Sequence, residues 1–269
     1  MRIHFASAGI AVLLASLACV PSSVGQQSHV GGLNGNPKHG EQLYQRYCIF
    51  CHGRYGDGRG ESAPYLDPKP RDFTVATFKC RSTPSGSLPL DSDLFDTITR
   101  GVHASNMPSW KPLTRQERVD LVAYVKAFSP KFTEEKPAAA VQIPPEPPTS
   151  AESVKRGAEL FQTMNCWACH GKEGRGNGPS AATLTDSKGN PITPFDLTSG
   201  TRLKCGDSDQ GIFRDLTTGL DGTPMPSFTD AMKPDQMWDV VHYIASLRAS
   251  SKKGAKLENT NQPNQTEKN

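Results

Sequence analysis

Four stretches of the chain place apolar residues at the three-to-four-residue spacing of an amphipathic helix. They cover roughly 37–47, 115–128, 153–165 and 234–247. Residues at this spacing lie on one face of a helix, and that face can pack against a core. Thr114 and Glu117 have the form of a capping box, which predicts the start of the second helix. Because glycine and proline are frequent between these stretches and strand-like alternation is rare, the pattern predicts an all-α fold.

Two copies of one pattern occupy most of the chain. Residues 48–52 read Cys-Ile-Phe-Cys-His, and residues 166–170 read Cys-Trp-Ala-Cys-His. Met107 and Met225 are separated by the same offset as the two motifs. A chain of 269 residues is long enough for two domains of ordinary size. The repeat therefore predicts two domains built from the same module.

The repeat sets the expected domain boundaries at residues 36–129 and 151–248. Residues 130–150 between them are rich in proline, a composition that favours an extended linker without a core of its own. Residues 249–269 are polar, and we expect them to form a disordered tail.

Residues 1–25 have the pattern of an export signal, with Arg2 followed by a short apolar run and then small residues. The run is too short to span a bilayer. Cleavage fits after Ala18 and after Gly25, so we expect a periplasmic or otherwise extracytoplasmic protein. If the cut falls before Cys19, that thiol could carry a lipid anchor, and membrane association is expected only in that case. Otherwise Cys19 leaves with the signal.

Each domain carries the pentapeptide Cys-x-x-Cys-His, which attaches c-type heme. The two thiols add across the vinyl groups of the heme, and the adjacent histidine supplies a nitrogen ligand to the iron. The predicted attachment residues are Cys48 and Cys51 with ligand His52, and Cys166 and Cys169 with ligand His170. Two covalently bound heme c groups, each with its iron, are therefore predicted. Attachment of heme outside the cytoplasm agrees with the export signal.

Met107 and Met225 are the candidates for the iron ligand on the opposite face of each heme. Each follows its histidine by the same number of residues, lies beside proline and precedes the closing helix. Methionine is a soft, neutral ligand that raises the heme potential. The alternative is that both residues fill gaps in the core. His103 lies near Met107, but its counterpart is Asp221, so a histidine ligand would break the repeat.

Cys80 and Cys205 occupy equivalent places in the two copies, and three interpretations remain open. They can form a disulfide if the domains pack about a pseudo-twofold axis in an oxidising compartment. They can be free structural thiols, or one can ligate a heme as a thiolate. A zinc site would need one of them together with the motif residues, and no thioredoxin-like strand pattern surrounds either Cys-x-x-Cys.

Basic residues follow each heme motif, and buried heme propionates need such donors. The candidates are Arg71, Lys79 and Arg81 in the first domain, and Arg202 and Lys204 in the second. Ordinary surface charge is the alternative for each of them.

The two Cys-x-x-Cys-His motifs, the Pro-Lys-Pro-Arg-Asp-Phe run at 68–73 and the Met-Pro-Ser-aromatic segments resemble diheme class I cytochromes c. The resemblance implies two small helical heme domains in tandem, with hemes close enough to exchange electrons. Members with this signature resemble electron-transfer subunits of larger periplasmic oxidoreductases. The second domain departs from it with Pro-Phe-Asp-Leu at 194–197 and an insertion at 185–193, which leaves its propionate environment open.

We therefore predict an electron-transfer protein rather than an enzyme, with no catalytic residue and with redox proteins as partners. It transfers single electrons as a soluble carrier or as a subunit of a larger redox complex. The net charge of +3 and the lack of a basic stripe exclude a nucleic-acid partner.

The rival prediction is a heme enzyme. Diheme thiosulfate dehydrogenases resemble this layout and use a cysteine ligand, which Cys80 or Cys205 would supply. A diheme peroxidase needs an open iron, whereas the sequence offers a methionine in both domains.

Overall fold

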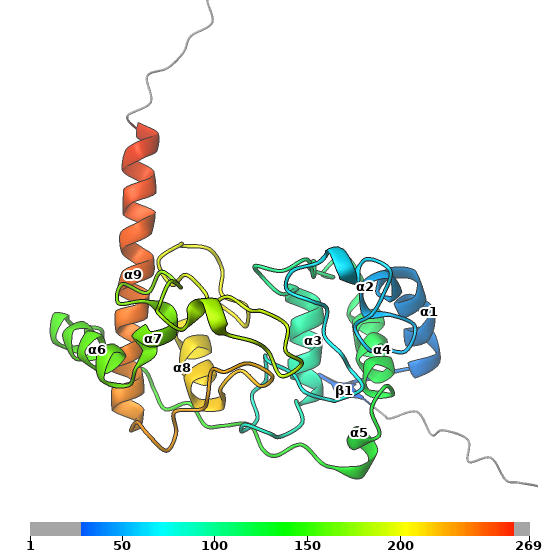
Figure 1. The fold of residues 1–269 in the computed structure, drawn as a ribbon. Helices are drawn as coiled ribbons and strands as arrows, with labels where there is room; N and C mark the ends of the chain where they lie inside the picture. The colour runs from blue at the N-terminus through cyan, green and yellow to red at the C-terminus, as the bar shows by residue number, and fades with distance from the viewer. Residues whose placement is uncertain (1–27, 261–269) are drawn as a thin grey trace, which may run out of the picture.

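The computed structural model describes residues 28–260, with side chains as far as residue 249. The expected export signal at 1–25, with both cleavage positions and Cys19, lies outside the described residues, as does the end of the tail at 261–269. Figure 1 shows two lobes side by side, one for each half of the described chain, with the segment after α5 crossing between them.

Helices, 3-10 turns and loops make up almost all of the described chain, so the all-α prediction is confirmed. The first lobe contains the antiparallel strands β1 (His29–Val30) and β2 (Leu33–Asn34), then α1 (Pro37–Tyr47), α2 (Ile49–His52), η1 (Ala63–Tyr65), α3 (Asp91–Arg100), α4 (Arg115–Lys126) and the short α5 (Lys131–Glu134). The second lobe contains α6 (Ala151–Thr163), α7 (Cys166–His170), η2 (Ala181–Thr183), α8 (Asp209–Thr218) and α9 (Pro234–Thr260).

The four predicted helices correspond to α1, α4, α6 and α9, and the capping box at Thr114 is present at the start of α4. The sequence prediction misses α3 and α8, which occupy equivalent places in the two copies, although both have apolar residues at helical spacing. Each buries one small apolar face, which includes Leu94 and Ile98 in α3, and Ile212 and Leu216 in α8.

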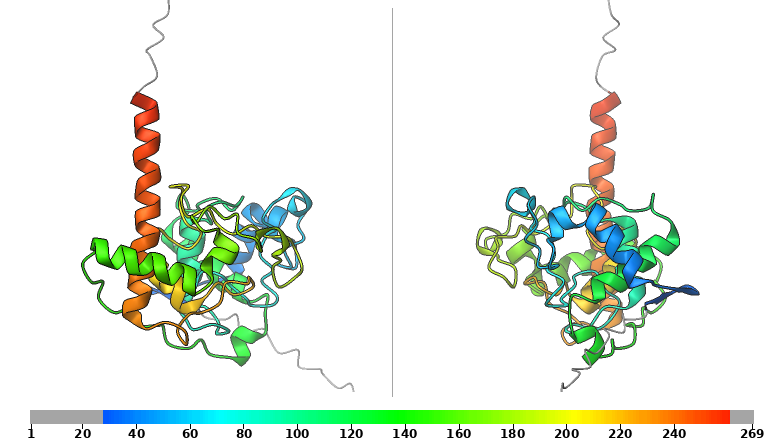
Figure 2. Two further views of the ribbon diagram at one scale, coloured as in Figure 1. Left: turned by 60° about the vertical axis from the view of Figure 1, so that its left-hand side comes forward. Right: turned by 90° about the vertical axis from the view of Figure 1, so that its right-hand side faces the viewer.

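The last helix is longer than predicted. We expect disorder from residue 249 onward, but α9 continues to Thr260, so this expectation is wrong for residues 249–260. Alanine, lysine, leucine and glutamate are frequent in that segment, and these residues have high helix propensity. Figure 2 shows this end of α9 projecting away from the body of the molecule.

In each lobe the helix before the motif crosses the closing helix at a glycine. Gly40 of α1 faces Asp120 of α4, and Gly157 of α6 faces Asp239 of α9. A β-carbon at either glycine would overlap the backbone carbonyl of the facing aspartate. Because glycine has no β-carbon, the two helices can approach this closely. Both copies therefore close their cores with the same contact.

Each lobe has an apolar core of its own. Tyr44 and Leu121 are each 1% exposed in the first, as are Phe161 and Trp238 in the second. In the first core the Tyr44 hydroxyl donates to the backbone carbonyl of Gly53, with an oxygen–oxygen distance of 2.7 Å. Phe161 takes the equivalent place in the second core and has no hydroxyl, so the two cores are similar but not identical.

A disulfide joins the two lobes. It links Cys80 to Cys205, whose Cα atoms are 5.1 Å apart. Of the three interpretations that the sequence leaves open, the disulfide is confirmed. Equivalent positions of the two copies meet here, as expected for domains that pack about a pseudo-twofold axis.

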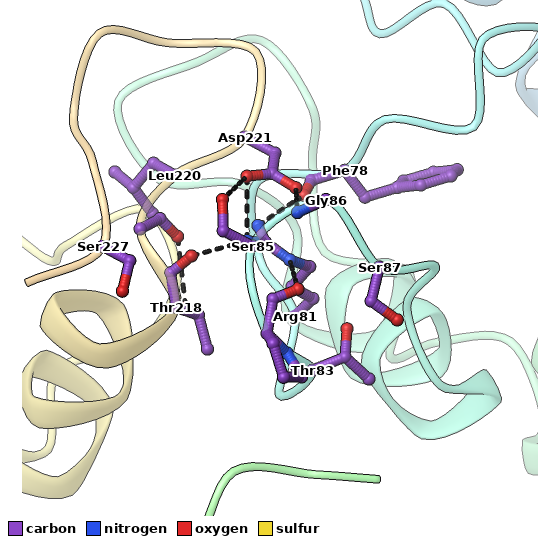
Figure 3. A network of polar contacts seen from close by, with 12 residues as sticks. Phe78, Arg81, Thr83, Ser85, Gly86, Ser87, Thr218, Leu220, Asp221 and Ser227 are labelled. Atoms are coloured by element: carbon purple, nitrogen blue, oxygen red, sulfur yellow. Dashed lines mark hydrogen bonds and ion pairs between the residues drawn. The ribbon is translucent and has the colours of Figure 1, made fainter. Parts of the chain in front are cut away.

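The first lobe contacts the second through a segment that is longer than the equivalent stretch of the second lobe. The stretch from Cys80 to Gly101 is seven residues longer than the stretch from Cys205 to Gly219, and segment 82–90 contains this extra length. Within it, the Ser85 hydroxyl and the Gly86 N–H both donate to the carboxylate of Asp221, each over 2.9 Å (Figure 3). This extra loop therefore contacts the turn that precedes Met225.

The second lobe makes the reciprocal contact through the insertion that the sequence shows at 185–193. Lys188 of this insertion forms an ion pair with Asp72 of the first lobe. The proline-rich segment also lies against the first lobe, since the Val141 N–H donates to the carbonyl of Ser82 over 2.7 Å. The parts of the chain in which the two copies differ thus build much of the contact between them.

Candidate functional site

The predicted iron ligand of each motif is fixed by one backbone hydrogen bond. Nδ1 of His52 lies 3.0 Å from the carbonyl oxygen of Arg71, and Nδ1 of His170 lies 3.1 Å from that of Phe195. A carbonyl oxygen can only accept, so Nδ1 carries the proton in both rings. Nε2 is then left with a free lone pair, which is the form of histidine that binds a metal.

Burial keeps both histidines neutral. Burial lowers the pKa of His52 and exceeds the opposing effect of the hydrogen bond to the Arg71 carbonyl. The pKa of His170 is also lowered by burial, against the hydrogen bond to Phe195. A neutral imidazole is the species that coordinates iron, so the electrostatics of each site favour ligation.

The first lobe has a cavity that brings the predicted attachment and ligand residues together. Cys48, Cys51, His52 and Met107 all line it. Much of the remaining wall is apolar or aromatic and includes Tyr44, Tyr47, Leu66, Phe73, Phe78, Leu94, Ile98, Trp110, Leu121 and Val125. A wall of this kind fits a large flat apolar cofactor that has a metal at its centre.

The same donors are gathered in the second lobe. Cys166 and Met225 pack against the core cluster around Phe161. The ring of His170 lies 6.5 Å from the ring of Phe161, measured between centroids. The second motif and the second methionine therefore share one apolar neighbourhood.

Both methionines are held by the same turn. The carbonyl of Met107 accepts from the N–H of Val102, and the carbonyl of Met225 accepts from the N–H of Leu220, both over 3.1 Å. A glycine begins each turn, Gly101 with φ +74° in the first lobe and its counterpart with φ +66° in the second. A side chain is strained at such φ values, and a β-carbon there would press on the backbone of the methionine segment.

Other histidines of the described chain have partners of their own or lie away from the cavity. His39 is bonded through Nδ1 to Asp120 over 2.7 Å, and His242 is bonded through Nδ1 to the Ser153 hydroxyl over 2.9 Å. His103 is not among the residues that line the first cavity in the described part of the chain. The geometry thus favours methionine over histidine opposite the motif.

The candidate propionate donors separate into two groups. Arg71 and Lys79 line the first cavity, and so does Lys204, which comes from the second lobe. Sequence reasoning assigns Lys204 to its own domain and misses this placement. The equivalence of the neighbouring cysteines is the signal that could have found it, because a disulfide there brings Lys204 to the other copy.

Arg81 has a different role from the one expected. Its side chain is fully buried, and the guanidinium donates to the carbonyl of Thr218 and pairs with Asp221 at 2.8 Å (Figure 3). Two further hydrogen bonds of 3.3 Å lead to the carbonyls of Phe78 and Pro84. The expectation that Arg81 binds a propionate is therefore wrong, since its donors are used to hold the lobes together.

Arg202 also lies outside the cavity group. Its side chain is 71% exposed and lies 3.6 Å from the carboxylate of Asp207. In the described residues, 28–260, no cluster of three or more histidine, cysteine or acidic side chains could hold a metal ion. Across the same residues, no helix is both long and apolar enough to cross a membrane.

Comparisons with known proteins agree with this geometry. The family description "Cytochrome c" matches residues 154–248, and "Cytochrome C oxidase, cbb3-type, subunit III" matches residues 35–125. The chain is 26% identical over 216 residues to the Cbb3-type cytochrome c oxidase subunit FixP of Azorhizobium caulinodans. That alignment covers 77% of this chain and 58% of the length of the relative.

A solved structure gives a fuller match. It is a chain of the Kuenenia stuttgartiensis reducing HAO-like protein complex Kustc0457/Kustc0458, with 41% identity and a TM-score of 0.76. The match covers 78% of this chain and 96% of that chain. With both halves matched to cytochrome c families and the fold shared over nearly all of that relative, this chain belongs to the cytochrome c family and is of the electron-transfer type.

Proposed function

We propose that this protein is a diheme carrier of single electrons that works outside the cytoplasm, with one heme c in each of the domains 36–129 and 151–248. The observation that carries the proposal is the duplicated ligand geometry. In His52 and in His170, Nδ1 is hydrogen-bonded to a backbone carbonyl, and Nε2 is left with a free lone pair. A heme iron bound by a histidine and a methionine would supply a one-electron couple and would leave no position for a substrate.

The protein residues position and insulate this couple. Cys48 and Cys51, with Cys166 and Cys169, would attach the cofactors to helices α2 and α7. The apolar walls exclude water, and Met107 and Met225 would close the face opposite the histidines. No described residue has to give or take a proton in this scheme.

The thiosulfate dehydrogenase-like alternative loses its ligand. It needs a thiolate from Cys80 or Cys205, and both sulfurs are engaged in the disulfide. The remaining cysteines of the described chain belong to the two heme motifs. The disulfide therefore favours the carrier over the enzyme.

Partners and location are part of the proposal. FixP is named as an oxidase subunit, and the Kuenenia chain is part of a named protein complex. We take a larger redox enzyme as the partner of this chain. The export pattern at 1–25 supports an extracytoplasmic location, with a lipid anchor only if Cys19 is retained and modified.

The test is the optical spectrum and mass of the purified full chain. The mass should correspond to two attached hemes, and the oxidised protein should show the weak far-red band of iron–methionine bonding without a high-spin signal. Met107→Ala and Met225→Ala should each remove about half of that band. Met237→Leu changes a core methionine that is 2% exposed and should leave the band intact.

Other outcomes would argue for a different protein. A high-spin spectrum, or ready binding of carbon monoxide to the reduced protein, would contradict the carrier and favour an enzyme or a sensor. Retention of the full band in both methionine variants would contradict Met107 and Met225 as ligands.

A further inference from the structure

Four cations from two domains line the first cavity. Lys69 of the first domain is one of them, and its ammonium donates to two backbone carbonyls of the same domain. Arg71 and Lys79 come from the first domain, and Lys204 comes from the second. The disulfide holds Lys204 there, since its chain neighbour Cys205 is bonded to Cys80, which also lines the cavity. In addition, the backbone carbonyl of Lys204 lies 3.7 Å from the sulfur of Cys80.

Arg71 is also enclosed by the second domain. A β-carbon at position 222 would lie 3.0 Å from a guanidinium nitrogen of Arg71. Gly222 belongs to the turn before Met225, and the carbonyl of Gly222 accepts from the N–H of Ser187 in the insertion at 185–193. The wall around Arg71 is therefore built by both domains.

These cations repel one another in a partly buried place. Burial, together with the charges of Arg71 and Lys204, lowers the pKa of Lys79 to about 8 against the attraction of Asp186. Burial is also the largest cause of the lowered pKa of Arg71 and of Lys204. Positive charges that are crowded and partly desolvated are stabilised by an anion placed among them.

Two of the acidic side chains nearby are already engaged, and a third, Asp67, attracts the charge of Lys204 without a hydrogen bond or ion pair to it. The carboxylate of Asp72 accepts hydrogen bonds from Thr74 and pairs with Lys188. The carboxylate of Asp186 accepts from the backbone and the side chain of Asn190. Unlike Lys69, the side chains of Arg71, Lys79 and Lys204 have no hydrogen bond or ion pair from their terminal nitrogens to residues 28–249.

We infer that Arg71, Lys79 and Lys204 form a carboxylate-binding site shared by the two domains, which binds the propionates of the first heme. The inference rests on the proposed function, because it needs a heme in the first cavity. It goes beyond that function in assigning a residue of the second domain to the first cofactor. It also gives the disulfide a role, which is to hold Lys204 at the cavity wall.

The site has a consequence for the potential of the first heme. Reduction adds one negative charge to the cofactor, and nearby positive charge favours the reduced form. Removal of the Lys204 charge should lower the midpoint potential of the first heme and leave that of the second nearly unchanged. The shared site thus makes the potential of one domain depend on a residue of the other.

The experiment measures both midpoint potentials of the full holoprotein by spectroelectrochemical titration. Met107→His assigns the first-domain midpoint, because it changes the ligand of that heme alone. Lys204→Gln should lower the assigned midpoint by up to about 59 mV. This shift corresponds to a tenfold lower ratio of reduced to oxidised heme at a given potential. Lys204→Arg keeps the charge and should restore most of the shift.

Lys155→Gln is the matched control, because it removes the same charge from an exposed position on α6 of the same domain. It should move neither midpoint appreciably. If Lys204→Gln does not accumulate, Lys204→Met removes the charge and keeps the apolar stem of the side chain. The inference is overturned if the first midpoint does not shift in folded Lys204→Gln or folded Lys204→Met. It is also overturned if Lys204→Gln and Lys155→Gln shift this midpoint equally.

Failure of this inference is distinguishable from failure of the proposed function. Two hemes by mass, with a first midpoint that responds to Met107→His but not to Lys204→Gln, would remove the shared site and leave the diheme carrier in place. Absence of heme at Cys48 and Cys51, or a methionine variant that moves neither midpoint, would remove both.

Discussion

The two domains keep the same ligand geometry and differ in the surfaces beside it. His52 and His170 make equivalent bonds to backbone carbonyls, and Met107 and Met225 lie on equivalent turns. The surfaces beside the motifs have diverged. Phe50, Tyr55 and Tyr65 are 57%, 72% and 88% exposed in the first domain, and the aligned residues of the second are Ala168, Glu173 and Thr183.

The domain boundary shows a second difference. The first domain extends segment 82–90 toward the second, and the second extends segment 185–193 toward the first. Each segment is longer than the equivalent stretch of the other copy. The comparison teaches that the residues predicted to hold the cofactors are duplicated, whereas the domains are joined by one duplicated feature, the disulfide, and by segments that differ between the copies.

The link that both copies share should give the largest effect. Replacing Cys80 and Cys205 by serine should destabilise the protein by about 4 kcal/mol, because a disulfide that closes a long loop restricts the unfolded chain. Urea unfolding should then separate into two transitions, one for each domain. Each single variant should behave like the double, since either removes the same bond, and one unchanged transition would contradict the clamp.

The shared helix crossing comes next. Gly40→Val should destabilise the first domain by about 3 kcal/mol, because the new side chain overlaps the carbonyl of Asp120. Gly157→Val should do the same to the second domain at Asp239. Gln42→Val is the control, since residue 42 is exposed on the same helix as Gly40. If thermal unfolding shows that the two glycine variants lose different amounts of stability, the two helix crossings are not equivalent.

Asp221→Ala tests a contact that only one domain offers. It leaves the buried guanidinium of Arg81 without its carboxylate and should cost about 2 kcal/mol in denaturant unfolding. Asp230→Ala, at an exposed position of the same domain, is the control and should have little effect. Similar losses for Asp221→Ala and Asp230→Ala would show that the contacts of segment 82–90 do not hold the domains.

The smallest effect concerns the charge of Lys79, which faces Arg71, Lys204 and Asp186 and has a pKa lowered to about 8. Protonated Lys79 favours the reduced heme, so the first midpoint should fall as the pH rises through this pKa. The total fall should stay below about 59 mV, and the second midpoint should change less. Lys79→Gln should remove the slope, and a slope that persists would assign it to another group.

Much of the candidate site was predictable, because heme attachment uses a short contiguous motif. The motif alone identifies Cys48, Cys51 and His52, and the repeat extends the prediction to Met107 and Met225. The long amphipathic helices were predictable from periodicity. Helices α3 and α8 were missed although they carry the same signal, since Leu94 and Ile98 in α3 and Ile212 and Leu216 in α8 are four residues apart.

The roles of the charged residues were not predictable in the same way. Arg71, Lys79 and Arg81 lie within one short stretch, yet two of them line the cavity and Arg81 is buried against the other domain. Neighbours in a loop can point in different directions, and no periodicity reports this. The partner of such a side chain depends on distant residues, here Thr218 and Asp221.

By itself, the sequence determined that the chain repeats one module, that each copy carries a heme-attachment motif, and that a methionine follows each motif at a constant interval. These properties are local or repeated, so the order of residues along the chain is enough to recognise them. Only the tertiary structure decided that Cys80 pairs with Cys205, that Arg81 joins the domains, and that Lys204 reaches the cavity of the other domain. Each of these depends on the packing of two domains against each other, which is a property of their surfaces in space.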